Sequence, residues 1–173
     1  MADFASRLAN RIDGVIRWIS RSASWLCLVL VVIICTSVVL RYFFGISSLG
    51  FDELQWHIYS ASWLLGFSYA VAEGTHVRND IIYSRFSELT QLRIDFYGYM
   101  FLVLPFVGLV IYHSYFFAEW AYQQNEGSID PGGLSYRWII KSALPIGFTI
   151  FAIATISRVL DLSAKISIAK RVA

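Results

Sequence analysis

Charged residues are scarce in this chain. Of its 173 residues, 14 are Lys or Arg and 12 are Asp or Glu, so that 15% are charged while 57% are apolar and 17% are aromatic. An ordinary soluble domain carries about 25% charged residues, which it needs to cover its surface. The shortage of charge therefore argues against a soluble domain.

The sequence motifs of common soluble enzymes are also missing. It contains no glycine-rich phosphate-binding loop, no nucleophile elbow and no Cys-x-x-Cys pair. Its two cysteines, Cys27 and Cys35, lie eight residues apart on one predicted helix, a rise of ~12 Å that no disulfide spans. We expect them to fill apolar space. The sequence thus predicts a protein that is not an enzyme and holds no cofactor or metal of its own.

What the chain has instead is a set of long stretches without a formal charge. They are Ser22–Leu40, Leu54–Ala72, Phe96–Ala118 and Ser142–Ser157. A helix of about 20 residues crosses the ~30 Å hydrocarbon core of a bilayer, and lipid offers no partner to non-helical backbone. We therefore predict an all-α integral membrane protein, one domain over 1–173, with four transmembrane helices at about 22–44, 54–73, 96–118 and 138–160. The last span includes Lys141, whose ammonium group we expect to reach the headgroups.

The distribution of Lys and Arg predicts the orientation of these spans, because cytoplasmic segments are enriched in both residues. Eleven of the fourteen fall in the N-terminal segment, the connection between spans 2 and 3, and the basic tail 161–173 with Arg158 just before it. Only Arg41, Arg137 and Lys141 fall on the other side. Both termini of this multi-pass protein are therefore expected to be cytoplasmic.

Two flanking segments are amphipathic. Within residues 1–21, apolar residues recur at helical spacing between arginines, and residues 82–96 repeat the pattern. Such helices suit the inner headgroup layer, where they would contact membrane lipids. The alternative is that both segments are cytoplasmic extensions of the neighbouring spans.

Charged residues lie only near the ends of the predicted spans, and the stretches between them contain no Asp, Glu, Lys or Arg. A subunit that itself carries ions or solutes usually places ionisable groups in mid-membrane or breaks its helices there. Pro105 and Pro145 do not form paired breaks. The chain is thus expected to support another protein rather than to transport a solute by itself.

Two histidines offer a different interpretation. His57 and His113 are expected at similar depth near the outer ends of spans 2 and 3, where they would ligate one haem b from both sides. The alternative function is therefore a haem-binding membrane anchor for electron transfer. An alternative to haem binding is that His57 is a hydrogen-bonded side chain at the membrane surface.

A mixed cluster of charges follows the second span. Glu73 and His76 have the Glu-x-x-His spacing of di-iron bundles, but the comparable pair, Glu53 with His57, lies ~30 Å away along the helix. A shared metal is therefore excluded. Two interpretations remain: Glu73, His76, Arg78 and Asp80 form a hydrogen-bonded network at the helix end, or they contact another subunit.

A series of short motifs then becomes recognisable: "RYFFG" (Arg41–Gly45), "DELQW" (Asp52–Trp56), Gly66, "HVRND" (His76–Asp80) and "ALPIGFTIF". In this order and spacing the chain resembles the DctQ-like family, the small membrane subunit of tripartite ATP-independent periplasmic (TRAP) transporters. The match runs from about Arg41 to Leu160. The family pattern falls on these residues: Arg41, Tyr42, Glu53, Gly66, His76, Arg78, Asp80 and Leu144–Phe148 with Pro145 and Gly147. The chain departs from it at Phe51-Asp52, where the family has Trp-x, and at Thr75, where it has a charged residue.

The resemblance implies an accessory role. Such subunits pair with a large multi-span membrane subunit that holds the substrate and sodium sites, and a soluble periplasmic binding protein delivers an organic acid, commonly a C4-dicarboxylate or a sialic acid. The resemblance implies a location in the bacterial inner membrane and no contact with nucleic acid. We expect this chain to brace the fixed part of the large subunit. Acidic residues of the outer loops are candidates for seating the binding protein or are simply solvated: Glu53, Glu119, Glu126 and Asp130.

Overall fold

The structure is a computed structural model that describes residues 2–73 and 83–172. Within these residues the regular elements are all helical. They are α1 (Ala2–Phe44), α2 (Leu49–Ala72), α4 (Glu88–Gly98), the π-helical turn η1 (Tyr99–Val103), α5 (Leu104–Gln123) and α6 (Trp138–Val172). The all-helical fold class is therefore confirmed.

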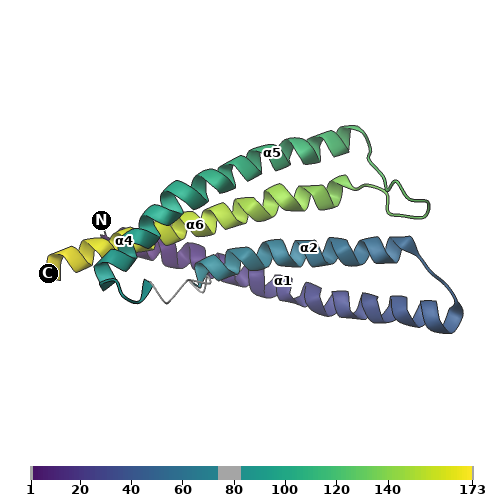
Figure 1. Ribbon diagram of the computed structural model, residues 1–173, viewed down its shortest axis with the longest axis horizontal. Helices are drawn as coiled ribbons and strands as arrows, with labels where there is room; N and C mark the ends of the chain where they lie inside the picture. Colours follow the sequence, from purple (N-terminus) through teal and green to yellow (C-terminus); the bar gives the residue numbers. More distant parts are fainter. Residues whose placement is uncertain (1, 74–82, 173) are drawn as a thin grey trace.

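The long helices form two hairpins that lie side by side (Figure 1). One hairpin is α1–α2, which turns at Gly45 with a left-handed φ of 65°, a conformation that favours glycine. The other is α5–α6. Helix α6 packs on α1, α2, α4 and α5, so it is the element that joins the two hairpins.

Helices α4 and α5 follow one path, with η1 between them. Pro105 lies at the start of α5, and because proline has no N–H group it removes a hydrogen bond to the turn before it. The widened π-helical turn stands at that position, and π turns are a common way of accommodating such a break. The helical path from Glu88 to Gln123 thus continues past the proline.

Three helical segments are long and apolar enough to cross a membrane: Arg7–Phe44, Glu88–Gln123 and Trp138–Ala169. Helix α2 has 24 residues, about 36 Å of rise, so its length suffices. It is not among the three because Gln55, His57 and several Ser, Tyr and Trp residues lower its hydropathy. Residues 54–72 therefore form the helix that the prediction of a fourth span requires, but their hydropathy is lower than that of the apolar stretches in the other three segments.

The helices run further than the predicted spans. Helix α1 is unbroken from Ala2 to Phe44, which corresponds to the alternative in which residues 1–21 extend the first span. Helix α6 continues to Val172, so residues 161–172 of the predicted basic tail are helical. Near the termini α1 and α6 pack on each other, and Ala9, Ile16 and Leu162 are buried there.

The interior consists mostly of small side chains, whereas many large apolar side chains lie outside. Buried positions include Ala23, Ala118, Ala121 and Ala154, with Ser68 among the buried polar ones. Small residues let helix backbones approach closely, as is typical of helices packed within a bilayer. The exposed Trp, Phe, Leu and Val side chains form a far larger apolar surface than a soluble monomer carries.

Candidate functional site

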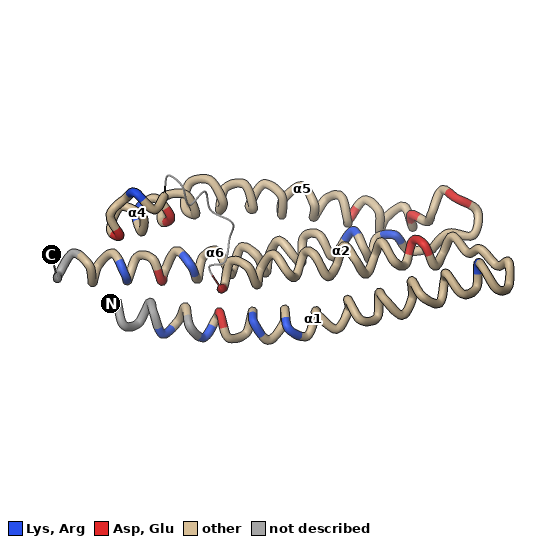
Figure 2. The backbone as a smooth tube through the Cα atoms, turned by 60° about the horizontal axis from the view of Figure 1, so that its bottom comes forward, with Lys and Arg blue, Asp and Glu red and all other residues tan. Residues whose placement is uncertain are grey.

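Within the described residues, Lys, Arg, Asp and Glu gather toward the two ends of the bundle, with a stretch of backbone between them that carries none (Figure 2). One end holds the α1–α2 turn and the α5–α6 loop. We call it the loop end, and we call the opposite end, where both termini lie, the terminal end.

At the loop end a single carboxylate holds the α5–α6 loop against α2. Glu53 accepts a hydrogen bond from the Ser128 hydroxyl at one oxygen and from the backbone N–H of Leu134 at the other, 2.6 Å away. Ser128 also donates its backbone N–H to the Leu134 carbonyl at 3.0 Å. Both sides of the loop therefore meet at Glu53. We call these three residues the Glu53 clamp.

The clamp changes the acidity of Glu53. Hydrogen bonds from Ser128 and then from Leu134 stabilise the carboxylate form, so they lower the pKa of Glu53 from its ordinary value. Gly133 lies beside the clamp, and a Cβ there would collide with the Ser128 side chain. The loop conformation and the charge on Glu53 thus depend on each other.

A second polar contact at the loop end involves Lys141. Its ammonium group lies 2.5 Å from Glu126 Oε2 and 4.0 Å from the ring centre of Phe117, and its side chain is only 13% exposed. The expectation that Lys141 reaches outward to the headgroups is therefore wrong, because its partners are within the protein. Glu126 is likewise engaged in this internal ion pair.

The remaining loop-end residues of the sequence prediction are more exposed. Arg41 pairs with Asp52 across the α1–α2 turn at 3.2 Å, while Tyr42 is 80% exposed. Glu119 accepts a hydrogen bond from Gln123 at 3.3 Å, and Asp130 is exposed at the tip of the loop. Beside Asp130 the Ile129 side chain is 92% exposed, which the sequence analysis did not anticipate.

At the terminal end Glu73 follows the last residue of α2 and pairs with Arg17 of α1 at 3.5 Å. Its predicted neighbours His76, Arg78 and Asp80 lie outside the described residues. Further along α1, Asp13 accepts a hydrogen bond from the buried Ser157 hydroxyl at 2.7 Å. The contacts of Glu73 and Asp13 are thus between helices.

The two motif glycines of the predicted site differ sharply. A Cβ on Gly147 would lie 2.9 Å from the Cβ of Leu64, so this glycine allows α6 to approach α2 closely. A Cβ on Gly66 would have nothing within 4 Å. Pro145 lies inside α6 near its first residue, and the Thr149 hydroxyl donates to its carbonyl at 2.6 Å. Internal packing therefore explains Gly147 and leaves Gly66 unexplained.

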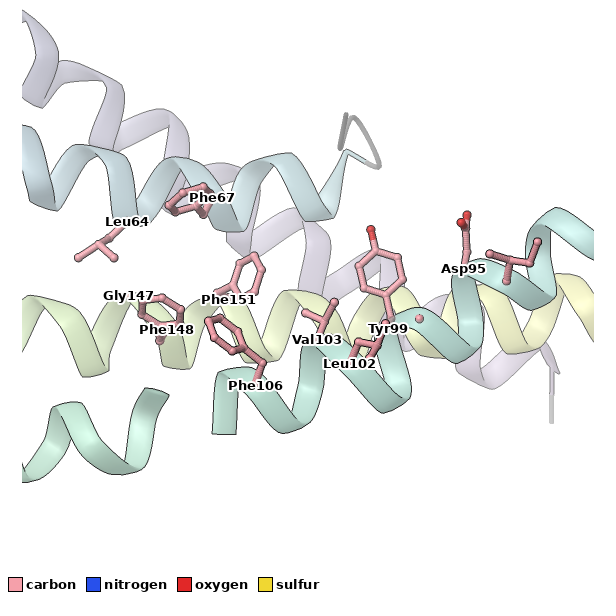
Figure 3. Close-up of a pocket in the computed structure, with 12 residues that line it drawn as sticks. Leu64, Phe67, Asp95, Tyr99, Leu102, Val103, Phe106, Gly147, Phe148 and Phe151 are labelled. Carbon is pink, nitrogen blue, oxygen red and sulfur yellow. The ribbon is translucent and has the colours of Figure 1, made fainter. Parts of the chain in front are cut away.

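An apolar groove of about 610 Å³ runs between α2 and the η1–α5 path, with α6 as its floor (Figure 3). Phe67 of α2, Phe106 of α5, and Phe148 and Phe151 of α6 line it, and Asp95 lies at one end. The Asp95 carboxylate accepts a hydrogen bond from Tyr83 at 3.0 Å. The groove therefore suits an apolar occupant.

The haem alternative finds no support in this arrangement. His57 lies on α2 and His113 on α5, where the Tyr112 ring touches it edge-on, and neither lines the apolar groove. In the part of the chain that the structure describes, no group of three or more His, Cys, Asp or Glu side chains is placed to hold a metal ion.

The apolar outer surface, the charge-free middle and the helical fold define an integral membrane protein. The model of the DctQ component of tripartite ATP-independent periplasmic transporters matches residues 30–165. Since this covers most of the chain, the protein belongs to the DctQ family, which has no enzymatic activity. A comparison with individually curated proteins finds no match.

Several contacts in the site had little signal in the sequence. Ser128 and Leu134 were not predicted to bind Glu53, because nothing in a loop sequence shows which distant side chain it meets. Lys141 did carry a signal, since a lone cation inside an apolar segment requires a partner. An acidic residue at the adjoining loop, Glu126, was the available one.

Proposed function

We propose that this chain is the accessory small subunit of a sodium-coupled TRAP transporter and braces the fixed part of the large membrane subunit. The observation that carries the proposal is the stretch between the two ends of the bundle, in which the described residues include no Asp, Glu, Lys or Arg. A subunit that itself carries an ion or an organic acid usually places charged groups at mid-depth. Membership in the DctQ family supports the same role.

In this function all four long helices cross the inner membrane, and both termini face the cytoplasm. The large subunit holds the substrate and sodium sites, and a periplasmic binding protein delivers an organic acid of the C4-dicarboxylate or sialic acid class. The excess of Lys and Arg at the terminal end supports this orientation. Cysteine labelling tests it: a cysteine at Ile129 should react with a membrane-impermeant reagent from the periplasm, and one at Ile168 should not.

Co-purification tests the accessory role. Tagged chain, co-expressed with the large subunit of its own transporter and extracted in mild detergent, should retain that subunit through size-exclusion chromatography. Uptake into cells should require both. Recovery of this chain as a stable monomer beside a fully active large subunit would contradict the proposal.

We also propose that the α5–α6 loop contacts the periplasmic binding protein. The clamp holds the loop, and its tip presents the exposed Ile129 and Asp130. Glu119 is a more peripheral candidate, and Glu126 acts indirectly because it is paired with Lys141. Asp130→Lys should slow uptake most at low salt, where charge steering is strongest. Equal uptake by this variant and the parent at every salt concentration would contradict the contact.

A further inference from the structure

Helix α2 carries one exposed face that is neither purely apolar nor charged. Exposed residues recur on this face at three, four and seven positions, and we call them the α2 stripe: Trp56, Tyr59, Ser60, Trp63, Gly66 and Phe67, the last at the edge of the stripe toward α6. Trp56 is 69% exposed and Trp63 is 59% exposed. The opposite side of α2 packs inward, where the Leu65 carbonyl accepts the Ser20 hydroxyl of α1 and Leu64 meets Gly147 of α6.

The polar atoms of the α2 stripe are poorly suited to lipid. Trp63 lies near the middle of the 24-residue helix, and Ser60 lies almost one turn before it. The described part of the chain provides no hydrogen-bond partner for the Ser60 hydroxyl or the Trp63 indole N–H, and acyl chains provide none either. Outside the groove, the path from η1 to α5 exposes Phe101 and Leu109, which are ordinary lipid-facing residues, and also Tyr112, His113 and Tyr115 further along α5. The α2 stripe is therefore an outward face whose polar atoms lie near the middle of a helix without a partner in the described chain.

Gly66 adds an independent observation. Glycine inside a helix lowers its stability relative to alanine, and at Gly147 the contact with Leu64 explains the choice. At Gly66 no atom of the described chain occupies the space where a Cβ would lie. Gly108 of α5 is equally open, so an open glycine alone indicates nothing. Only Gly66 lies beside Ser60 and Trp63.

The α2 stripe is also continuous with the apolar groove. Phe67 belongs to both, and its ring contacts Phe151 of the groove floor at 6.4 Å between ring centres. Beyond the floor, Phe106 of α5 forms the far wall (Figure 3). The groove and the α2 stripe thus form one surface, which is apolar in the groove and carries the hydrogen-bonding groups of Ser60 and Trp63 along α2.

We propose that the α2 stripe is the surface on which one transmembrane helix of the large subunit packs, with part of that helix reaching into the groove. This inference rests on the proposed function and specifies the face that carries it. The partner helix lies close to Gly66, where the missing Cβ leaves room for a small residue, and it supplies hydroxyl or carbonyl oxygens to Trp63 and Ser60. It is a helix without a charge at this depth, because the stripe offers none.

Adding bulk at Gly66 tests the surface, and Gly108 provides a matched control. Both glycines lie inside helices, and both have open space around the Cβ position. Gly66→Leu and Gly108→Leu should therefore leave the isolated chain equally stable and monodisperse in detergent. Co-purification with the large subunit should fall about tenfold or more for Gly66→Leu, since overpacking a formed interface has that cost, and should be unchanged for Gly108→Leu.

A photo-crosslinking amino acid at position 63, with the same group at the exposed Val31 of α1 as control, gives a second measurement. Crosslinks to the large subunit are expected from position 63 and not from position 31. Retention of the partner by Gly66→Leu, equal loss in both glycine variants, or crosslinks only from position 31 would each overturn the inference while leaving the accessory role intact. Failure of the unmodified chain to co-purify would instead overturn the accessory role itself.

Discussion

The two ends of the bundle are held together in different ways. At the loop end, side chains far apart in the sequence meet: Glu53 and Ser128 are 75 residues apart, and Lys141 is largely buried between Glu126 and Phe117. At the terminal end, the ion pairs Arg158–Asp161 and Lys165–Asp161 lie within one helix. Polar contacts between helices also occur there. Arg17 pairs with Glu73, and both side chains are partly exposed, while the Ser157 hydroxyl lies within hydrogen-bonding distance of Asp13 and of the Ala9 carbonyl, 144 and 148 residues away in the sequence.

This difference indicates where the fold depends on individual polar residues. The α5–α6 loop has no hydrophobic core of its own, so its conformation rests on Glu53 and Glu126. The terminal end is formed by long helices packed through Ala9, Ile16 and Leu162, and its polar pairs add to a structure that apolar packing already specifies. Substitutions of polar residues should therefore have larger effects at the loop end.

The largest effect is expected when Glu126 is removed. Glu126→Ala leaves the Lys141 ammonium in a mostly enclosed site without its counter-charge, which should lower the stability by about 2 kcal/mol after allowance for partial exposure. Thermal unfolding in detergent measures the loss. Glu126→Ala combined with Lys141→Met should recover most of it, because the uncompensated charge is then gone. A double variant no more stable than Glu126→Ala would show that the ion pair is not what holds this end.

A loosening of the loop is expected from Glu53→Gln. The amide cannot accept the Ser128 and Leu134 hydrogen bonds as strongly as a carboxylate, so the loop should become more mobile while the helices remain folded. Limited proteolysis within residues 124–137 should proceed several-fold faster. Asp130→Asn is the control, because Asp130 is an exposed carboxylate of the same loop. Equal cleavage of both variants would argue against the clamp.

The clamp should also respond to acid. Because the folded pKa of Glu53 is lowered, its contribution is complete above the ordinary carboxyl value of about 4.3 and is lost as the pH falls through the lowered pKa. A spin label at Ile129→Cys, with Cys27 and Cys35 replaced by alanine, should report increased loop mobility in that range. In a Glu53→Gln background the mobility should already be high at neutral pH and should change less on acidification than in the parent. A parent whose mobility does not change on acidification would contradict the assignment.

The sequence predicts the apolar helices well and the polar contacts poorly, for physical reasons. Helix α1 ends at Phe44, where the predicted first span ends, because an apolar run gives way to Gly45. Residues 1–21 were ambiguous because an amphipathic repeat suits both a membrane surface and the buried face of α1 against α6. The Glu53 clamp depends on how the α5–α6 loop folds back onto α2. Hydrophobic periodicity predicts helices but does not predict which distant side chain a loop contacts.

A smaller loss of stability is expected from Ser157→Ala, which changes a buried residue at the terminal end. Ser157→Ala removes a fully buried hydroxyl that lies 2.7 Å from Asp13 Oδ1 and 3.1 Å from the Ala9 carbonyl oxygen, and the loss of such a hydrogen bond costs about 1 kcal/mol. Ser163→Ala is the control, since that hydroxyl donates within its own helix to the Leu160 carbonyl. Unfolding temperatures of the two variants in the same detergent provide the comparison. A loss at Ser157 as large as that of Glu126→Ala would remove the proposed difference between the ends.

The smallest effect is expected from Arg17→Ala. Its ion pair with Glu73 is long, 3.5 Å, and both side chains are substantially exposed, at 42% and 32%, so solvent screening should limit its contribution to less than about 1 kcal/mol. Arg21→Ala, one turn further along α1, removes a cation for which the described residues show no ion pair and serves as the control. The two variants should unfold at nearly the same temperature when isolated. If only Arg17→Ala loses the large subunit on co-purification, then the pair positions the end of α2 for its partner and does not stabilise the bundle, which would place a functional contact at the terminal end as well.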